Sequence, residues 1–358
     1  MHDLIQQIHR IAEKIRNAEK KRTALARFLL DINPAIKLVQ PIPEVQPLNA
    51  RVIGVDGGIV KKSFHGFDFM LVRAAAVCFL YKNNKVEKVE YHPSRSPEPE
   101  PELFESISDL EWNYLTSLCR LQREMDTATQ SLEMKPDILL LDGLILPHYS
   151  DRPSKSSRTY HHYDSLIRAY KNLFEQALEN RVMLAGVVKD SRSSMFCDFI
   201  KNEILSQVKH TDTKEIITLL AATRDTALLH RVLKKGERSR LFAYSKTPAE
   251  HPVLKDMQQY STAISSFYLK TAQWDRPIRI DVLIPEGEDK DSYADYLASA
   301  ILSISGHHAG YGIPAPLIEA DNIAKLSDTE LEDYYYQIVN LTGHISSTMD
   351  LRRAQRPF

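Results

Sequence analysis

The stretch that most restricts the fold is a short apolar run, residues 138–141, which lies between Pro136 and the pair Asp142-Gly143. Consecutive apolar residues without polar alternation are typical of a strand that is buried on both faces of its sheet. Such a strand needs helices on each side. The run therefore predicts a central strand of an α/β sheet, and the apolar run at residues 182–188 predicts its neighbour.

The elements before and between these runs suggest a topology. Three β-type runs come first and predict three antiparallel strands, at residues 52–55, 67–81 and 86–91. A Pro/Glu loop and then two helices, at residues 103–132 and 160–180, alternate with the two apolar strands. Three antiparallel strands followed by αβαβ are the topology of a ribonuclease H-like mixed sheet flanked by helices.

The rest of the chain is expected to add helical and β embellishments to this core. Residues 190–235 are expected to be helical, and a Gly/Pro loop is expected at residues 305–316. The later strands either extend the first sheet or form a lobe of their own; they are expected at residues 240–244, 265–270 and 278–284.

Apolar residues recur at steps of three and four through residues 1–32, which predicts an amphipathic helix. Its apolar face seeks either the body of this protein or another subunit. Four prolines in residues 33–50 predict an extended linker in which no helix persists. We therefore expect the main domain at residues 51–330 and a C-terminal helix and tail at residues 331–358.

Charge and composition limit the possible partners. The 358 residues include 46 Lys and Arg against 47 Asp and Glu, so a broad basic surface is excluded and any nucleic-acid site is local. No apolar run approaches the roughly 20 residues of a membrane span, which predicts no membrane partner. The three cysteines lack zinc-site spacing and are expected to be reduced thiols of a cytoplasmic protein.

Two aspartates are expected at neighbouring strand ends. Asp56 follows residues 52–55 and precedes Gly57-Gly58, and Asp142 follows the apolar run 138–141. An Asp-Gly-Gly sequence by itself is also typical of an ordinary turn. Because ligands bind at the carboxyl ends of strands in open α/β sheets, two such aspartates in one sheet indicate a functional site.

Helix and strand geometry selects a third acid. Asp142 lies about 16 Å up its strand at ~3.3 Å per residue. The preceding helix rises ~1.5 Å per residue, so the same height falls about 11 residues before its end near residue 134. Glu124 is the acid at that level. The alternative is a solvated helix residue that pairs with Arg120.

Three converging carboxylates repel one another unless a divalent cation neutralises them. Carboxylate oxygens suit Mg²⁺ and Mn²⁺, and two such ions can cleave a phosphodiester. Lys189 and Arg192 follow the strand at residues 182–188, where they and free helix N–H groups would hold a phosphate. A capping loop with solvated charges is the alternative.

At this point the sequence resembles the NurA family of nucleases over about residues 50–330. The resemblance rests on five segments in order: RVIGVDGG at residues 51–58, Arg123-Glu124 before LLDG at residues 140–143, VKDSR at residues 188–192, PIRI at residues 277–280 and PLIEADN at residues 316–322. It implies a ribonuclease H-like fold and a Mn²⁺-dependent (or Mg²⁺-dependent) DNA nuclease with endonuclease and 5′-to-3′ exonuclease activity on single- and double-stranded ends. It also implies a homodimer that works with a HerA-type hexameric ATPase in DNA end resection and double-strand break repair.

The resemblance also implies a set of site residues. Asp56, Glu124 and Asp142 would be the metal-binding acids, and Lys189 would join them in catalysis. Family members often carry a histidine where this chain has Asp321, which can ligate Mn²⁺ as well; His307 and His308 are alternative ligands. Tyr311 is a candidate for stacking on a DNA base, beside Lys189 and Arg192 as DNA-binding residues.

Two other functions fit parts of the sequence. A sugar-kinase or actin-like ATPase also begins with an Asp-Gly-Gly hairpin, but it needs a second glycine-rich phosphate loop, and Gly57-Gly58 is the only glycine pair in the chain. The second is a non-catalytic adaptor that keeps the fold and docks on the ATPase through its N-terminal helix.

Overall fold

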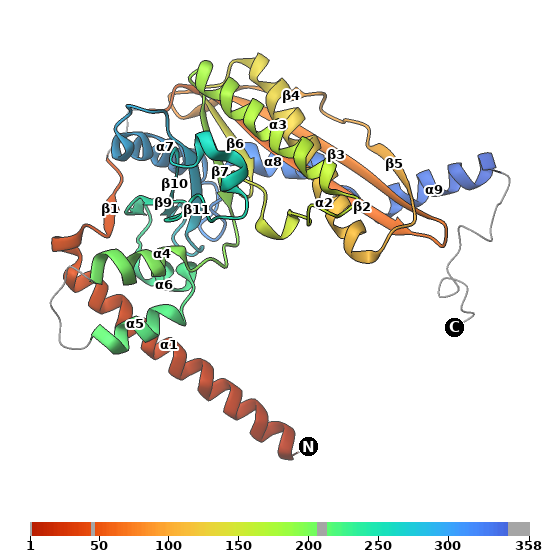
Figure 1. Ribbon diagram of the computed structural model, residues 1–358. Helices are drawn as coiled ribbons and strands as arrows, with labels where there is room; N and C mark the ends of the chain where they lie inside the picture. Colours follow the sequence, from red (N-terminus) through yellow and green to blue (C-terminus); the bar gives the residue numbers. More distant parts are fainter. Residues whose placement is uncertain (1, 44–46, 206–212, 343–358) are drawn as a thin grey trace.

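The computed structural model describes residues 2–43, 47–205 and 213–342 (Figure 1). Its centre is one large mixed sheet in the order β1-β8-β10-β11-β7-β6-β2-β3-β4, with β5 paired to β3 and β9 paired to β10. The strands are β1 Val39–Pro41, β2 Ala50–Ser63, β3 Phe67–Lys82, β4 Lys85–His92, β5 Glu100–Glu105, β6 Ile138–Asp142, β7 Met183–Val188, β8 Glu237–Ser239, β9 Phe242–Ala243, β10 Ile264–Leu269 and β11 Ile278–Leu283.

Helices cover both faces of this sheet. The helices are α1 His2–Ile36, α2 Asp109–Ser131, α3 Tyr160–Glu179, α4 Met195–Phe199, α5 Thr213–Ala221, α6 Asp225–Val232, α7 Lys290–Ile304, α8 Ala315–Ala324 and α9 Asp328–Thr342. Short 3₁₀ helices lie at Leu132–Met134, Tyr149–Asp151 and Leu254–Tyr260, and a π-helical turn at Ile200–Ile204. Within the described part of the chain, each helix is too short or too polar to cross a membrane.

The predicted ribonuclease H-like topology is confirmed. Strands β2, β3 and β4 are antiparallel, and β6 and β7 then join β2 in parallel through the crossover helices α2 and α3. The later strands extend this sheet rather than form a separate lobe, because β11 pairs antiparallel with β7.

Two apolar layers follow from the alternation of side chains along the strands. Ile53 and Leu139 face α2 and α3, whereas Val52 and Leu140 face α7 and α8. Because successive side chains of a strand point to opposite faces, residues 54 and 56 of β2 and residue 142 of β6 point toward α8.

The first strand is longer than the sequence predicts. Instead of ending in a turn at Asp56, β2 continues through Gly57-Gly58 to Ser63 and pairs with β3 along its whole length. Its parallel pairing with β6 stops at Val55. Asp56 therefore lies in mid-strand, at the point where the parallel part of the sheet ends.

Other boundaries differ for local reasons. The expected Pro/Glu loop forms β5 against β3, so the helix expected from residue 103 begins at Asp109, where Ser108 caps it. The linker contains the last turn of α1 and the edge strand β1. The expected loop at residues 305–316 ends before Ala315, since a proline in the first turn of α8 needs no N–H partner. Expected structure at residues 206–212 and 343–358 lies outside the described residues.

The apolar stripe of α1 has a buried part and an exposed part, so the chain's own body is confirmed as one expected partner and another subunit stays a prediction. Leu25 and Leu29 are buried against the α5 and α6 region of the same chain. The first half of the helix extends away from the body (Figure 1). There the apolar residues Leu4, Ile8, Ile11 and Ile15 are 55–59% exposed.

Close packing of α8 on β2 generates a first prediction. A Cβ at Gly54 would lie 2.4–2.6 Å from backbone atoms of Pro316 and Leu317, so a side chain there would push α8 away from the sheet. We expect Gly54→Ala to lower the free energy of unfolding by about 1–3 kcal/mol, measured by urea denaturation. The control is Gly306→Ala, where a Cβ meets nothing within 4 Å. Equal stabilities of the two variants would contradict this packing.

Candidate metal centre at the end of the parallel strands

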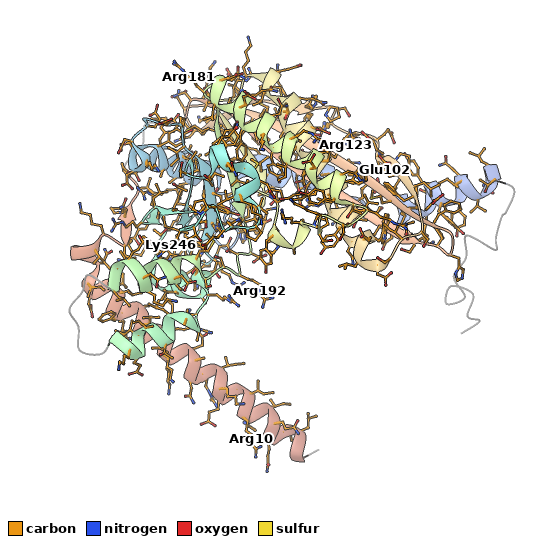
Figure 2. The ribbon with its side chains drawn as sticks, in the orientation of Figure 1. Arg10, Glu102, Arg123, Arg181, Arg192 and Lys246 are labelled. Atoms are coloured by element: carbon orange, nitrogen blue, oxygen red, sulfur yellow. The ribbon has the colours of Figure 1, made fainter. Side chains whose placement is uncertain are left out.

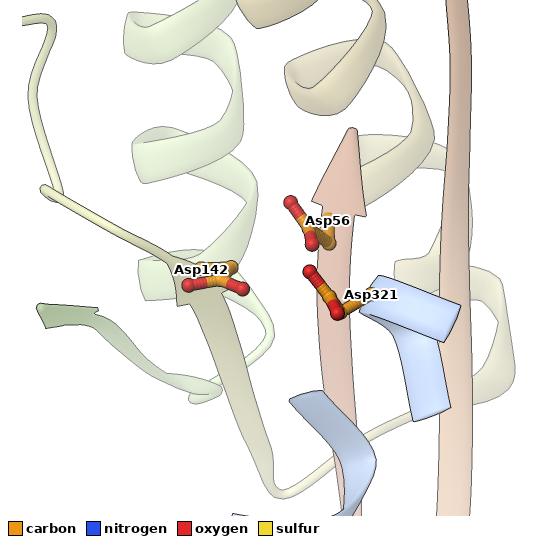
Figure 3. Close-up of side chains that lie close together, drawn as sticks. All are labelled: Asp56, Asp142 and Asp321. Atoms are coloured by element: carbon orange, nitrogen blue, oxygen red, sulfur yellow. The ribbon is translucent and has the colours of Figure 1, made fainter. Parts of the chain in front are cut away.

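Three carboxylates meet on the face of the sheet that α8 covers. Asp56 comes from β2, Asp142 from the end of β6 and Asp321 from α8 (Figure 3). One oxygen of each lies within 4.8 Å of the others. Of the predicted ligands, these three are brought together, including the aspartate that stands in place of the family's histidine.

Local sequence explains this convergence. Asp56 and Asp142 end the paired parts of two adjacent parallel strands, which the register Val55–Leu141 holds side by side. Gly54 lets α8 lie directly on β2, and Asp321 is on the turn of α8 that passes the two strand ends. The three carboxylates are thus carried by strands and a helix whose positions the core fixes.

The environment disfavours negative charge on Asp56. Burial raises the pKa of Asp56 to about 9, and the charges of Asp142 and Glu124 act in the same direction. Its interaction with the Asp321 side chain adds to the rise, while a 2.7 Å hydrogen bond from the backbone N–H of Gly57 opposes it. Such a cluster of carboxylate oxygens, short of positive charge, fits a hard divalent cation such as Mn²⁺ or Mg²⁺.

Glu124 lies behind this group. It approaches β2 from α2, on the opposite face from Asp56, and the absence of a side chain at Gly57 leaves it room: a Cβ there would be 2.5 Å from the Glu124 Cγ. Burial raises the pKa of Glu124 to about 7 although Arg120 lowers it. Glu124 forms the salt bridge with Arg120 that the alternative expected, but it is buried and not solvated, and it is not a member of the 4.8 Å group.

Lys189 is the predicted basic residue that reaches the site. Its Nζ donates a 2.5 Å hydrogen bond to Oδ2 of Asp142. Burial opposes its positive charge, but Asp142, Asp321 and Asp56 outweigh burial and hold the pKa of Lys189 above its usual value. Lys189 is therefore a cation at the edge of the acid cluster.

The prediction that free helix N–H groups after Lys189 would help to hold a phosphate is wrong. The N–H groups of Phe196 and Cys197, at the start of α4, both donate to the buried carboxylate of Asp225. That of Met195 donates to Ser193. These N–H groups cannot bind phosphate, because Asp225 already caps the helix. Asp225 lies 28 residues after Cys197 in the chain, so no local sequence pattern predicts this cap.

The remaining candidates lie outside the acid cluster. Arg192 is exposed, and Figure 2 shows it projecting outward from the segment after β7. His307 and His308 lie in the loop before α8, where His307 contacts the Ile304 carbonyl and His308 accepts a hydrogen bond from Gly310. Neither histidine joins the three aspartates. Tyr311, in the same loop, is 48% exposed.

The fold and the site define the class of this protein as an α/β protein with a ribonuclease H-like sheet and an acidic cluster at the ends of its central parallel strands. The profile of the NurA domain matches residues 50–326. The chain belongs to the NurA family. The search of curated proteins found no match.

Solved structures agree with this assignment at the level of the fold. The NurA nuclease from Sulfolobus solfataricus superposes with a TM-score of 0.61 at 15% identity, covering 96% of this chain and 98% of that one. A structure described as NurA with manganese superposes with a TM-score of 0.53 at 12% identity, covering 94% of this chain and 98% of that one. A further NurA structure gives 0.55 at 13% identity, covering 94% and 97%. The chain thus has the NurA nuclease fold.

The raised pKa of Asp56 generates a prediction on stability. Between about pH 4 and about pH 9 the folded protein retains a proton on Asp56 that the unfolded chain has lost. The contribution of this carboxyl to stability is therefore complete at low pH and declines as pH rises through this window. In EDTA, we expect Asp56→Asn to be more stable than the unaltered protein, by a margin that grows from pH 5 to pH 8.

Urea unfolding at both pH values measures this margin. Asp333→Asn, which removes an exposed acid of α9, is the control for a lost carboxylate elsewhere. A margin for Asp56→Asn that stays constant or shrinks with rising pH would contradict the raised pKa of Asp56.

Proposed function

We propose that this protein is a divalent-metal-dependent DNA nuclease, with Mn²⁺ or Mg²⁺ bound by Asp56, Asp142 and Asp321. The observation that carries the proposal is the approach of three carboxylates to within 4.8 Å on a NurA nuclease fold. A related structure described as NurA with manganese supports the choice of metal. The proposed activity comprises endonuclease and 5′-to-3′ exonuclease cleavage of single- and double-stranded DNA ends.

The cation would supply Lewis acidity, which activates water and stabilises the charge of a phosphodiester under attack. The protein's part is to hold the ligands together before the metal arrives. Deprotonation of Asp56 must accompany metal binding, so affinity for the metal rises with pH up to about 9. Glu124 influences this step through its charge, which acts on Asp56 from the opposite face of β2.

Lys189 would bind a phosphate group of the substrate. Its ammonium neutralises part of the charge of Asp142 and presents the remaining donors toward a phosphate. With a net charge of −1, the whole chain lacks a strong attraction for DNA, so a local cation beside the metal ligands is needed. Exposed Arg192 would extend this positive region away from the metal.

The proposed biological setting is DNA end resection and double-strand break repair by a homodimer that works with a HerA-type hexameric ATPase. The exposed apolar residues of α1 support an assembly role for the first half of that helix. A helical segment of this length gains little stability from its own backbone in water, so a partner that covers these side chains would stabilise it.

Cleavage assays test the central proposal. We expect Mn²⁺, and to a lesser degree Mg²⁺, to support cutting of 5′- and 3′-labelled DNA, and EDTA to stop it. Asp56→Ala and Asp142→Asn should each reduce cleavage at least about a hundredfold, because each removes a ligand of the charge-stabilising ion. Asp333→Asn is the matched control. Full activity of either site variant would refute the assignment.

The order in which labels are lost distinguishes 5′-to-3′ digestion from internal cuts. If the unaltered chain does not cut DNA even with the cognate ATPase, but still binds the ATPase, the adaptor reading replaces the nuclease. Cleavage of ATP instead of DNA would support the kinase-like reading.

A further prediction concerns α1. Ile8→Lys combined with Ile15→Lys should lower the mass of the assembly, either the dimer or its complex with the ATPase, in light scattering. The urea midpoint should stay unchanged, since both side chains are exposed. Leu25→Ala is the contrasting variant: Leu25 is buried in the chain's own core, and its truncation should cost about 2–5 kcal/mol. An unchanged mass for the double variant would exclude this face from assembly.

A further inference from the structure

The loop between β10 and β11 carries an exposed aromatic side chain that the proposed metal site does not use. Trp274 is 73% exposed, whereas the chain's other tryptophan, Trp112, is 4% exposed. Indole is a large apolar group, and it is commonly exposed at sites that contact a ligand. Its position relative to the acid cluster is therefore informative.

Strand register places this loop at the same edge of the sheet as the acid cluster. Val187 pairs with Asp142, and Val188 pairs with Arg279 near the start of β11. The β10–β11 loop thus lies two to three strand spacings from β6, about 10–14 Å at ~4.8 Å per spacing. At ~3.4 Å per stacked nucleotide, that distance corresponds to about three to four nucleotides.

Hydrogen bonds fix this loop to the one that leads into α8. The N–H of Trp274 donates to the Ala309 carbonyl (2.9 Å), and that of Gly312 donates to Asp275 Oδ2 (2.7 Å). Buried Thr271 donates to the Gly312 carbonyl at 2.6 Å. Tyr311 stands in the second loop, so both exposed aromatic residues are on a braced backbone joined to the helix that supplies Asp321.

Exposed basic side chains belong to this loop and to the segment after β7 that carries Lys189. Arg276, two residues after Trp274, is 71% exposed and lies 3.8 Å from Asp190, the neighbour of Lys189. Arg192 follows in the same segment (Figure 2). Exposed aromatics beside arginines are the combination that binds single-stranded nucleic acid, since bases stack on the rings and phosphates pair with the cations.

Resting on the proposed nuclease function, we propose that Trp274, with Tyr311, forms a base-stacking platform for single-stranded DNA about three to four nucleotides from the bond that is cut. Arg276 and Arg192 guide the phosphates between the platform and the acid cluster. The platform positions the strand and takes no part in bond cleavage.

Tryptophan fluorescence tests binding without cleavage. In EDTA, oligothymidylate should quench the emission of the full-length protein, because a base stacks on the exposed indole. An abasic oligomer of the same length, which offers phosphates alone, should quench much less. Trp274→Phe, which leaves only the buried Trp112 emission, should show no such quenching. Equal quenching by the two oligomers would overturn the proposal.

Kinetics with substrates of graded length separate positioning from catalysis. Trp274→Ala should raise KM roughly 5- to 150-fold for strands that extend four or more nucleotides from the cut, with little change in kcat. Shorter strands should show no effect, and Trp274→Phe should recover most of the affinity. The control is Tyr296→Ala, which removes an aromatic residue of α7 that is as exposed as Tyr311.

The two proposals fail in different ways. An unchanged KM at every length for Trp274→Ala would overturn the platform while the nuclease stands. Absence of cleavage by the unaltered chain would refute the nuclease, and base-dependent quenching in EDTA would still support the platform.

Discussion

The site depends on the core of the sheet, which holds three carboxylates close together against their mutual repulsion. Asp56, Asp142 and Asp321 belong to elements separated by long stretches of sequence, yet the core holds their oxygens within 4.8 Å. Free chains would move such charges apart. Burial, reinforced by the neighbouring negative charges, raises the pKa of Asp56 so that it keeps its proton at neutral pH, and Lys189 balances part of the charge on Asp142. The apolar layers on both faces of the sheet contribute the folding free energy that offsets the cost of holding these carboxylates together.

The glycines of β2 make the arrangement possible. At Gly54 the backbone of α8 comes close enough to bring Asp321 to the strand ends, and at Gly57 the side chain of Glu124 fills the space on the other face. A strand with ordinary side chains at these positions would keep both helices further away. The same run of small residues suggested a turn from sequence, because glycine is typical both of turns and of close approach.

Local patterns predicted the central strands, the crossover helices and the ribonuclease H-like topology, since burial on both faces leaves a clear apolar run such as residues 138–141. Helix rise alone put Glu124 level with Asp142. The sequence also named Arg120 as a pairing partner, but the burial of Glu124 and the face of β2 that it approaches depend on where Gly57 leaves space. The capping of α4 by Asp225 and the bracing of Trp274 by Ala309 involve residues distant in sequence, so no local pattern announces them.

Glu124 acts on Asp56 from the other face of β2, through its charge alone. One thickness of backbone, at Gly57, separates Glu124 and Arg120 from the face on which the three aspartates meet. Substitutions on α2 at this level therefore alter the electric potential at the three aspartates without altering the aspartates themselves. Sequence changes behind the strand can therefore shift the proton affinity of the cluster while its three carboxylates stay the same.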